Sequence, residues 1–141
     1  VLHASWGVRL HPKDVIMIKT LLIAALSFAA SQAFALTITP YSAPALKAAQ
    51  SAGKPVALHF HANWCSTCRA QEKAFQGMKD APALKGITLL VVNHDEEKSL
   101  RKTLGVRSQS TVIVYKGEQQ TAKLAGETEP AALQQALKSA L

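Results

Sequence analysis

The sequence is poor in cysteine, glycine and proline, and each shortage excludes a class of protein. Its two cysteines are too few for a disulfide-stapled miniprotein or a four-cysteine zinc module. Seven glycines and six prolines among 141 residues exclude a collagen-like chain, and a hydrophobic content of 48% excludes a disordered one. The length and composition therefore indicate one ordinary globular domain.

Long apolar runs are also missing, and the one notable run predicts a secretory signal. Residues 21–30 are mostly apolar, follow Met17 and a lysine, and precede an Ala-x-Ala cleavage signal that ends at Ala35. The run is about half as long as a membrane-spanning helix must be. We predict an upstream or misassigned extension at residues 1–16, a signal peptide at residues 17–35 and a mature domain at residues 36–141.

Two alternatives remain open at the N-terminus. The apolar run can also be an uncleaved membrane anchor, and residues 1–16 can be a real extension. Because the signal pattern occurs without extra cysteines for disulfides, a Gram-negative periplasm fits better than a eukaryotic secretory route. We expect a periplasmic protein that keeps no membrane span after cleavage.

The basic excess of the chain does not indicate nucleic-acid binding. Residues 36–141 carry thirteen Lys and Arg against eight Asp and Glu, and the basic residues are scattered along the sequence. They form no arginine cluster and do not alternate with aromatic residues, as a site for single-stranded nucleic acid requires. We therefore interpret most of them as solvated faces and expect no nucleic-acid partner.

The mature region alternates between strand and helix patterns. Strands are predicted at residues 36–39, 56–61, 87–93, 111–115 and 120–125, the last two joined by a hairpin turn at Gly117. Helices are predicted at residues 45–52, 65–78 and 96–104, and from residue 129 to the end with Leu133, Ala136, Leu137 and Leu141 inward. This order predicts an α/β fold with a mixed central sheet and helices on both faces.

The two cysteines stand in a Cys-Ser-Thr-Cys motif that follows a buried strand and opens a helix. At a helix N-terminus, Cys65 lies near unpaired N–H groups and the positive end of the helix dipole, which favour its thiolate. Cys68 lies one turn further along the same helix face. Cys65 can thus attack a disulfide and Cys68 can resolve the product. Half of a zinc site and two inert core thiols are the alternatives.

The segment Phe60–Arg69 resembles the active-site segment of the thioredoxin superfamily. Residues 68–75 are similar to the helix after the motif in the C-terminal reducing domain of the bacterial transmembrane thiol reductant conductor, and the resemblance covers nearly all of residues 36–141. It implies the thioredoxin fold and a periplasmic thiol–disulfide oxidoreductase that needs no cofactor. Its implied partners are protein thiols and disulfides and a membrane electron donor or acceptor.

The sequence indicates the direction of electron flow and the oligomeric state less clearly than it indicates the fold. We favour a reductant over an oxidant and expect a monomer. A thioredoxin-like adaptor with inactive cysteines is a further alternative. The Ser66-Thr67 dipeptide is none of the common family pairs, and such dipeptides tune the potential over a range of about 150 mV.

Two further departures from the family pattern involve Ser110 and His59. Ser110 stands where the family has a cis-proline that faces the cysteines, and we expect a trans bond before it because a non-proline cis bond is costly. His59 stands where many thioredoxins keep a buried acid beneath the second cysteine. It either accepts the proton of Cys68 or is a core imidazole bonded to a backbone group.

A metal site is the rival hypothesis for the same cysteines. His59 and His61 are two apart on a strand and therefore share a face. Together with Cys65 and Cys68 they make a ligand set that suits zinc or copper. An iron–sulfur cluster bridged between two chains is also conceivable.

Other residues carry simpler expectations. Trp64 contributes either an apolar docking surface beside the motif or a core side chain. We expect Phe75 and Met78 in the core, Arg69 as a surface charge and His94 in a solvated loop.

Overall fold

The computed structural model describes residues 35–141, so the predicted extension and the predicted signal before Ala35 lie outside the described residues. The described residues follow the predicted β-α-β-α-β-α-β-β-α order, with an added 3₁₀ turn, η1 (Pro82–Leu84). The strands are β1 (Leu36–Pro40), β2 (Pro55–His61), β3 (Ile87–Asn93), β4 (Thr111–Lys116) and β5 (Gln119–Ala125). The helices are α2 (Ala43–Ser51), α3 (Ser66–Gly77), α4 (Lys98–Leu104) and α5 (Pro130–Lys138).

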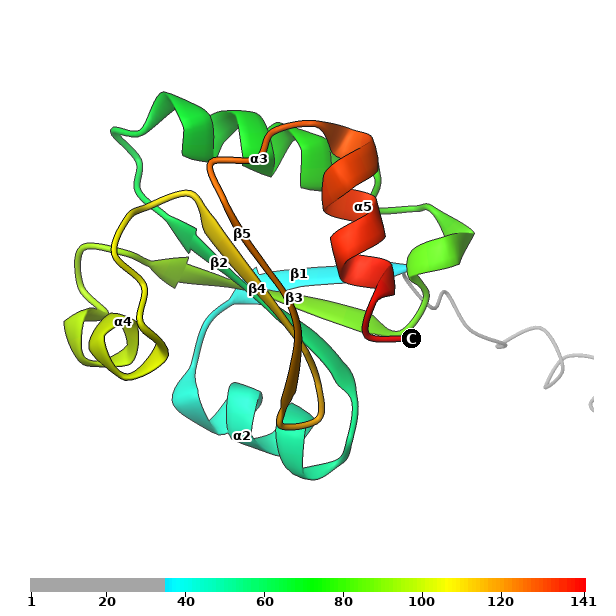
Figure 1. The fold of residues 1–141 in the computed structure, drawn as a ribbon. Coiled ribbons are helices and arrows are strands. Elements are labelled where there is room, and N and C mark those ends of the chain that lie inside the picture. The colour runs from blue at the N-terminus through cyan, green and yellow to red at the C-terminus, as the bar shows by residue number, and fades with distance from the viewer. Residues whose placement is uncertain (1–34) are drawn as a thin grey trace, which may run out of the picture. The chain divides into compact units, whose positions relative to one another are not determined.

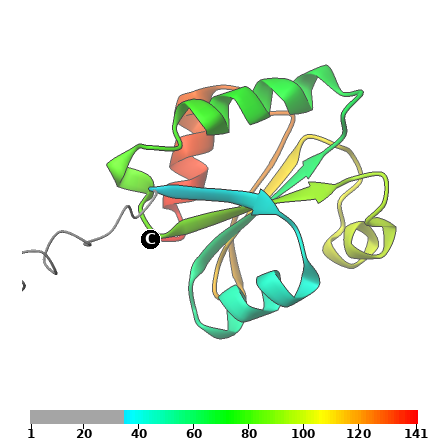
Figure 2. The same cartoon turned by 180° about the vertical axis from the view of Figure 1, so that it is seen from behind.

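The strands form one mixed sheet in the order β1-β3-β2-β4-β5. Strand β3 runs parallel to β1 and β2, whereas β4 is antiparallel to β2 and β5. Helices α3 and α5 cover one face of the sheet and α2 and α4 cover the other (Figure 1 and Figure 2). The predicted α/β class, with a mixed sheet between two helical layers, is confirmed. None of the helices in residues 35–141 is long and apolar enough to cross a bilayer.

The central strand β2 is buried on both faces because helices cover both. Its residues Val56, Leu58 and Phe60 pack toward α2 and α4, while Ala57 packs with Phe75 of α3 on the opposite face. Burying a large apolar side chain stabilises a fold by about 1.5–3 kcal/mol. This burial specifies the register of β2, and so places the motif that follows the strand. Phe75 and Met78 lie in the core, as predicted.

Several helix ends differ from the predicted ones by one to three residues, and α2 begins at Ala43 rather than residue 45. Helix α4 begins at Lys98 rather than residue 96, because the Asn93 side chain accepts the N–H groups of Asp95 (3.0 Å) and Glu96 (3.4 Å) in a turn. At the other end of the domain, α5 stops at Lys138, and Leu141 is 54% exposed instead of facing inward. The other three predicted inward residues of α5 are buried.

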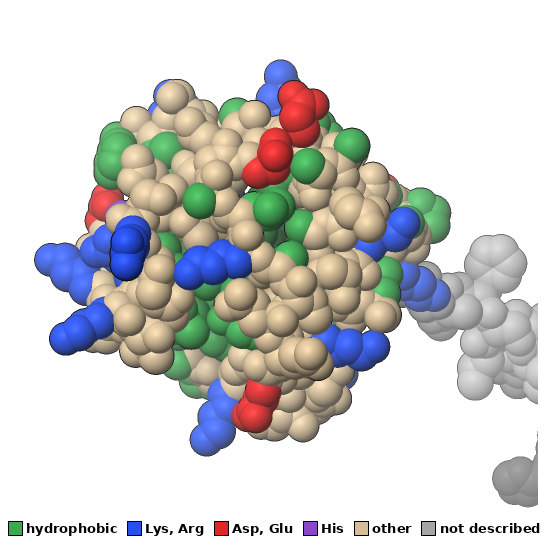
Figure 3. All heavy atoms as spheres, in the orientation of Figure 1, with side chains coloured by type: hydrophobic (Ala, Val, Ile, Leu, Met, Phe, Trp, Pro, Cys, Tyr) green, Lys and Arg blue, Asp and Glu red, His purple; other side chains and the backbone are tan. Residues whose placement is uncertain are grey.

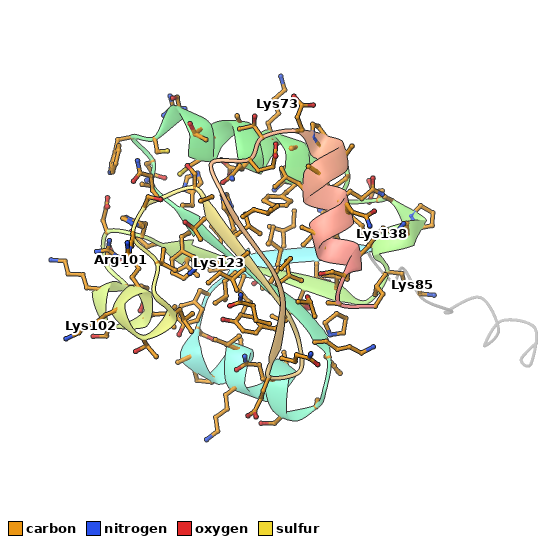
Figure 4. All side chains as sticks on the ribbon, viewed as in Figure 1. Lys73, Lys85, Arg101, Lys102, Lys123 and Lys138 are labelled. Carbon is orange, nitrogen blue, oxygen red and sulfur yellow. The ribbon has the colours of Figure 1, made fainter. Side chains whose placement is uncertain are left out.

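The basic side chains are less evenly spread than the sequence suggested. Lys and Arg gather over α4 (Figure 3), where Arg101 and Lys102 lie on the helix and Lys123 lies close by on β5 (Figure 4). Lys123 Nζ donates to the carbonyl oxygens of Leu104 (3.3 Å) and Gly105 (3.1 Å), where α4 ends. A cation there binds carbonyls that lack a partner in the helix and complements the helix dipole. Lys123 is exposed, as expected for most of the basic residues, and it has a structural partner in addition.

Candidate functional site

The cysteine motif lies where β2 ends and α3 begins, at the upper left of Figure 1. A turn closed by the Cys65 N–H and the Ala62 carbonyl (3.1 Å) leads out of the strand. Cys65 is the N-cap of α3, and its Sγ accepts the backbone N–H of Cys68 at 3.2 Å. Cys68 lies one turn further along, fully buried, with Sγ 3.8 Å from the Phe60 carbonyl oxygen. Both sulfurs therefore lie on one face of α3, as predicted.

The surroundings of the two sulfurs differ in a way that separates their roles. Burial raises the pKa of Cys65, but hydrogen bonds from the Cys68 thiol, the Ser110 hydroxyl and the backbone N–H groups of Cys68 and Thr67 outweigh it, so that its pKa is lowered. Burial raises the pKa of Cys68, and so does the hydrogen bond that its thiol donates to Cys65. Cys65 is thus the sulfur of the pair that ionises first, and Cys68 is the one that keeps its proton longer.

Ser110 lies against both cysteines. Its Oγ is 3.2 Å from Sγ of Cys65 and 3.0 Å from Sγ of Cys68, and the residue is 3% exposed. Ser110 has a φ of +62°, and it is the only non-glycine residue in the described part of the chain with a positive φ. The peptide bond before it is trans, as expected from the sequence.

Gln71, which was not identified from the sequence, links the motif helix to two loops. Its Nε2 donates to the carbonyl oxygens of Ser110 (2.9 Å) and Glu127 (2.7 Å), and the residue is fully buried. Because both carbonyls can only accept, the orientation of the Gln71 amide is determined and its Oε1 is the acceptor for His59. The sequence marks Gln71 in one way, as a polar residue on the same helix face as Cys68 and Phe75.

His59 is a buried, neutral imidazole that bonds to Gln71 rather than to a cysteine. Its Nε2 donates to Gln71 Oε1 at 2.9 Å, and its ring packs edge-on against Phe75. Burial, and more weakly the neighbouring His61, lower the pKa of His59 to about 4, although the hydrogen bond to Gln71 opposes them. Within residues 35–141, His59 hydrogen-bonds neither cysteine, so the structure gives the core interpretation, with a side-chain partner in place of a backbone one.

This buried imidazole predicts a specific dependence of stability on pH. Unfolding returns the pKa of His59 from about 4 to its ordinary 6.5, so the unfolded chain binds one more proton between these values. The free energy of unfolding should be highest above pH 6.5 and should fall by about 3 kcal/mol as the pH drops to 4. Denaturant titrations of the wild-type chain and of His59→Leu between pH 4 and pH 7 measure this free energy. In a plot of the free energy of unfolding against pH, the variant should lack the part of the slope that His59 contributes. Equal slopes in the two chains would contradict the assignment.

The predicted metal set is not assembled by the fold. His59 and His61 do share a face, with ring centroids 5.4 Å apart. However, His61 Nε2 lies 3.4 Å from Glu72 Oε2, an ion-pair distance without hydrogen-bond geometry, and His59 is bonded to Gln71. In the described range, no three His, Cys, Asp or Glu side chains are grouped so that they could hold a metal ion. In residues 35–141, the two histidines and the two cysteines of the alternative metal set therefore do not come together as one group.

Trp64 lies beside the motif with 63% of its surface exposed, which excludes the core role that the sequence left open. Its indole Nε1 donates to Asp95 Oδ2 at 2.8 Å, and this bond holds the ring over the loop after β3. A cavity of about 390 Å³ adjoins the ring and is also lined by His61, Asn93 and Glu96. The result is an exposed aromatic surface next to Cys65, suited to contact with another chain.

Two residues near Trp64, Arg69 and His94, differ in their exposure. Arg69 is an exposed charge, as predicted, and its guanidinium donates to the Asn63 carbonyl at 2.8 Å. His94 is 7% exposed, so its prediction as a solvated loop residue is wrong. Its ring lies between Asp95 (3.3 Å) and Arg101 (3.0 Å), which links the Trp64 partner to α4.

Comparisons with known proteins agree with this architecture. The Thioredoxin family model matches residues 43–139. The crystal structure of Trxlp from Edwardsiella tarda is 35% identical, covering 72% of this chain and 98% of that one with a TM-score of 0.68. Thioredoxin of Malassezia sympodialis is 29% identical over 84 residues, which are 60% of this chain and 79% of that protein.

A third relative is much longer than this chain. The thiol:disulfide interchange protein DsbD of Klebsiella pneumoniae is 36% identical over 77 residues, which are 51% of this chain and 13% of that protein. Together with the topology, these matches confirm the predicted thioredoxin fold.

Proposed function

Since the chain belongs to the thioredoxin family and is a thiol–disulfide oxidoreductase, we propose that it acts as a periplasmic reductant of protein disulfides through Cys65 and Cys68. The observation that carries the proposal is the asymmetry of the pair. Both cysteines are buried, but hydrogen-bond donors lower the pKa of Cys65, whereas burial and the bond to Cys65 raise that of Cys68. The thiolate can attack the substrate disulfide first, and the retained thiol beside it can then release the substrate.

The reaction proceeds in two exchanges. The Cys65 thiolate attacks one sulfur of a substrate disulfide, which forms a mixed disulfide and expels the other substrate sulfur as a thiolate. Cys68 then loses its proton and attacks Cys65 Sγ, and the first substrate sulfur leaves. Two electrons pass to the substrate, whose two thiolates are protonated from solvent, and the protein is left with a Cys65–Cys68 disulfide.

The nature of the donors to Cys65 supports the reducing direction. Strong oxidants of this type have nucleophile pKa values near about 3.5 and potentials near about −120 mV, because their reduced form is strongly stabilised. Among the described residues, the groups that hydrogen-bond Cys65 are a thiol, a hydroxyl and backbone N–H groups, all neutral, and burial works against them. A moderately stabilised thiolate corresponds to a potential closer to that of thioredoxin, about −270 mV.

The location and partners are supported by sequence observations. Residues 17–35 have the pattern of a secretory signal, and the similar protein DsbD is described as a thiol:disulfide interchange protein. On this basis the chain works as a monomer, meets substrate proteins at Trp64 and is re-reduced by a membrane electron donor. Fractionation of a Gram-negative host expressing the full chain tests the location. Protein shortened at Ala35 in the periplasmic extract supports it, and full-length protein in the cytoplasm contradicts it.

The equilibrium reduction potential tests the direction. The chain is equilibrated in thiol buffers of defined potential with a chelator present, and the reduced fraction is measured by alkylation and gel shift. We expect a two-electron transition near or below about −250 mV, whereas a transition above about −150 mV would make the protein an oxidant. The double variant Cys65→Ala/Cys68→Ala is the control and should show no transition.

A further inference from the structure

The hydroxyl of Ser110 is placed between the two reacting sulfurs. Its distances of 3.2 Å to Cys65 Sγ and 3.0 Å to Cys68 Sγ are both short for a contact with sulfur, and the group is screened from water. These two sulfurs are the hydrogen-bond partners that the structure gives to this hydroxyl. Among residues 35–141, the hydroxyl of Ser110 has no hydrogen-bond partner other than these two reacting sulfurs.

The backbone of Ser110 is held independently of its hydroxyl. Its N–H donates to the Phe60 carbonyl (2.9 Å), and its own carbonyl accepts from the Gly126 N–H (2.9 Å) and from Gln71 Nε2 (2.9 Å). A non-glycine residue at φ +62° is strained, and such a conformation persists only where the surroundings determine it. Three backbone hydrogen bonds aim one hydroxyl at the cysteine pair.

We propose that the Ser110 hydroxyl is a catalytic hydrogen-bond donor that serves the two cysteine sulfurs in turn. A serine hydroxyl has one proton to donate, so it can stabilise only one thiolate at a time. In the reduced protein it donates to Cys65 whenever that sulfur is the ionised one, and the lowered pKa of Cys65 makes it the first of the two to ionise. The proposal rests on the thiol–disulfide exchange activity, but not on the direction of electron flow.

The switch between sulfurs follows from the balance of charge in the two exchanges. When the Cys65 thiolate attacks a disulfide, its sulfur becomes part of a neutral mixed disulfide and no longer needs the donor. The negative charge next develops on Cys68, as this thiol loses its proton to solvent and attacks Cys65 Sγ. Since Oγ already lies within reach of both sulfurs, rotation about the Cβ–Oγ bond of Ser110 redirects the O–H to Cys68 while Oγ and the backbone stay in place.

Removing the hydroxyl should change both steps in a recognisable way. Loss of a hydrogen bond to a charged group should raise the Cys65 pKa by about one pH unit or more. At a pH below the Cys65 pKa of both chains, the thiolate fraction then falls about tenfold while its nucleophilicity rises about threefold, so attack slows about threefold. At a pH where Cys65 is ionised in both chains, the variant should be about threefold faster. The two pH–rate profiles therefore cross, which damage to the fold alone would not produce.

The experiment uses the reduced full-length chain and dithiobis(nitrobenzoate), whose first and second coloured thiolates report attack by Cys65 and resolution by Cys68. Profiles are measured for the wild-type chain, Ser110→Ala and Ser110→Gly. The glycine variant lacks the hydroxyl but accepts a positive φ, so it decides the matter if the alanine variant folds poorly. Ser108→Ala, an exposed serine in the same loop, is the matched control and should follow the wild type.

Each outcome is decisive. Crossed profiles for attack, together with resolution slowed about threefold at neutral pH in both Ser110 variants, support the proposal. Profiles that coincide with the wild type overturn it, and a change confined to one of the two steps overturns the alternation between sulfurs. If the wild-type chain itself releases no coloured thiolate, the exchange activity fails instead.

Discussion

Replacing Cys65 by alanine is expected to abolish disulfide reduction, with a loss of at least about a thousandfold in turnover, or about 4 kcal/mol in the barrier. No other group in the site can take over the attack. Cys68 is fully buried, and burial together with its bond to Cys65 raises its pKa. Turnover is measured with a protein disulfide as substrate and a chemical reductant to regenerate the dithiol.

The conservative variant Cys65→Ser makes this test sharper. It keeps the size of the side chain and an N-cap acceptor for the Cys68 N–H, so that α3 should begin at the same residue. It should be as inactive as the alanine variant, because a serine hydroxyl is not ionised near neutral pH. More than about a tenth of wild-type turnover in either variant would show that Cys65 is not the attacking residue.

Replacing Cys68 by alanine should stop the reaction halfway. The backbone N–H of residue 68 still donates to Cys65 Sγ, so the first attack continues, although without the Cys68 thiol the Cys65 pKa rises somewhat. No thiol then remains to release the substrate. Mixed disulfides between this variant and substrate proteins should accumulate as higher bands on a non-reducing gel and disappear when a reductant is added.

The same gel can also contradict the role of Cys68 as the resolving thiol. If the Cys68→Ala chain turns over substrate without any adduct, another group releases the mixed disulfide and Cys68 is not the resolving thiol. The wild-type chain is the control, and its adducts should be too short-lived to appear.

The sequence predicted the parts of the fold that depend on local patterns. Buried strands such as β2 and β3 show as continuous apolar runs, because helices cover both faces of the sheet. Gly105 marked the end of α4, where its positive φ is needed. The start of α4 was missed because the Asn93 side chain binds two following N–H groups, which local periodicity does not reveal.

The site was predictable only where its residues are neighbours in sequence. Cys65 and Cys68 are one helical turn apart, so their spacing indicates their geometry. Ser110 and Gln71 are 39 positions apart in the chain. Only the folded structure shows that the Gln71 side chain hydrogen-bonds the Ser110 carbonyl and so holds the loop in place. His94 was misjudged for a similar reason, since the partner that buries it, Arg101, lies on the next helix.

The separation of the four side chains in the alternative metal set also follows from the fold. Strand alternation correctly put His59 and His61 on one face, but it does not say which residues of α3 lie opposite them. Gln71 and Glu72 occupy that position, one turn beyond Cys68, and they contact the two imidazoles. The cysteines are left with Ser110 as their polar side-chain neighbour.

The central claim is that Cys65 is the residue that becomes covalently joined to the substrate. Peptide mapping by mass spectrometry tests it most directly, after the reduced Cys68→Ala and Cys65→Ala chains have each been mixed with the same disulfide substrate for the same short time. We predict a substrate adduct on Cys65 in the first chain and none on Cys68 in the second. An adduct on Cys68 formed at a comparable rate would contradict the assignment of the two roles.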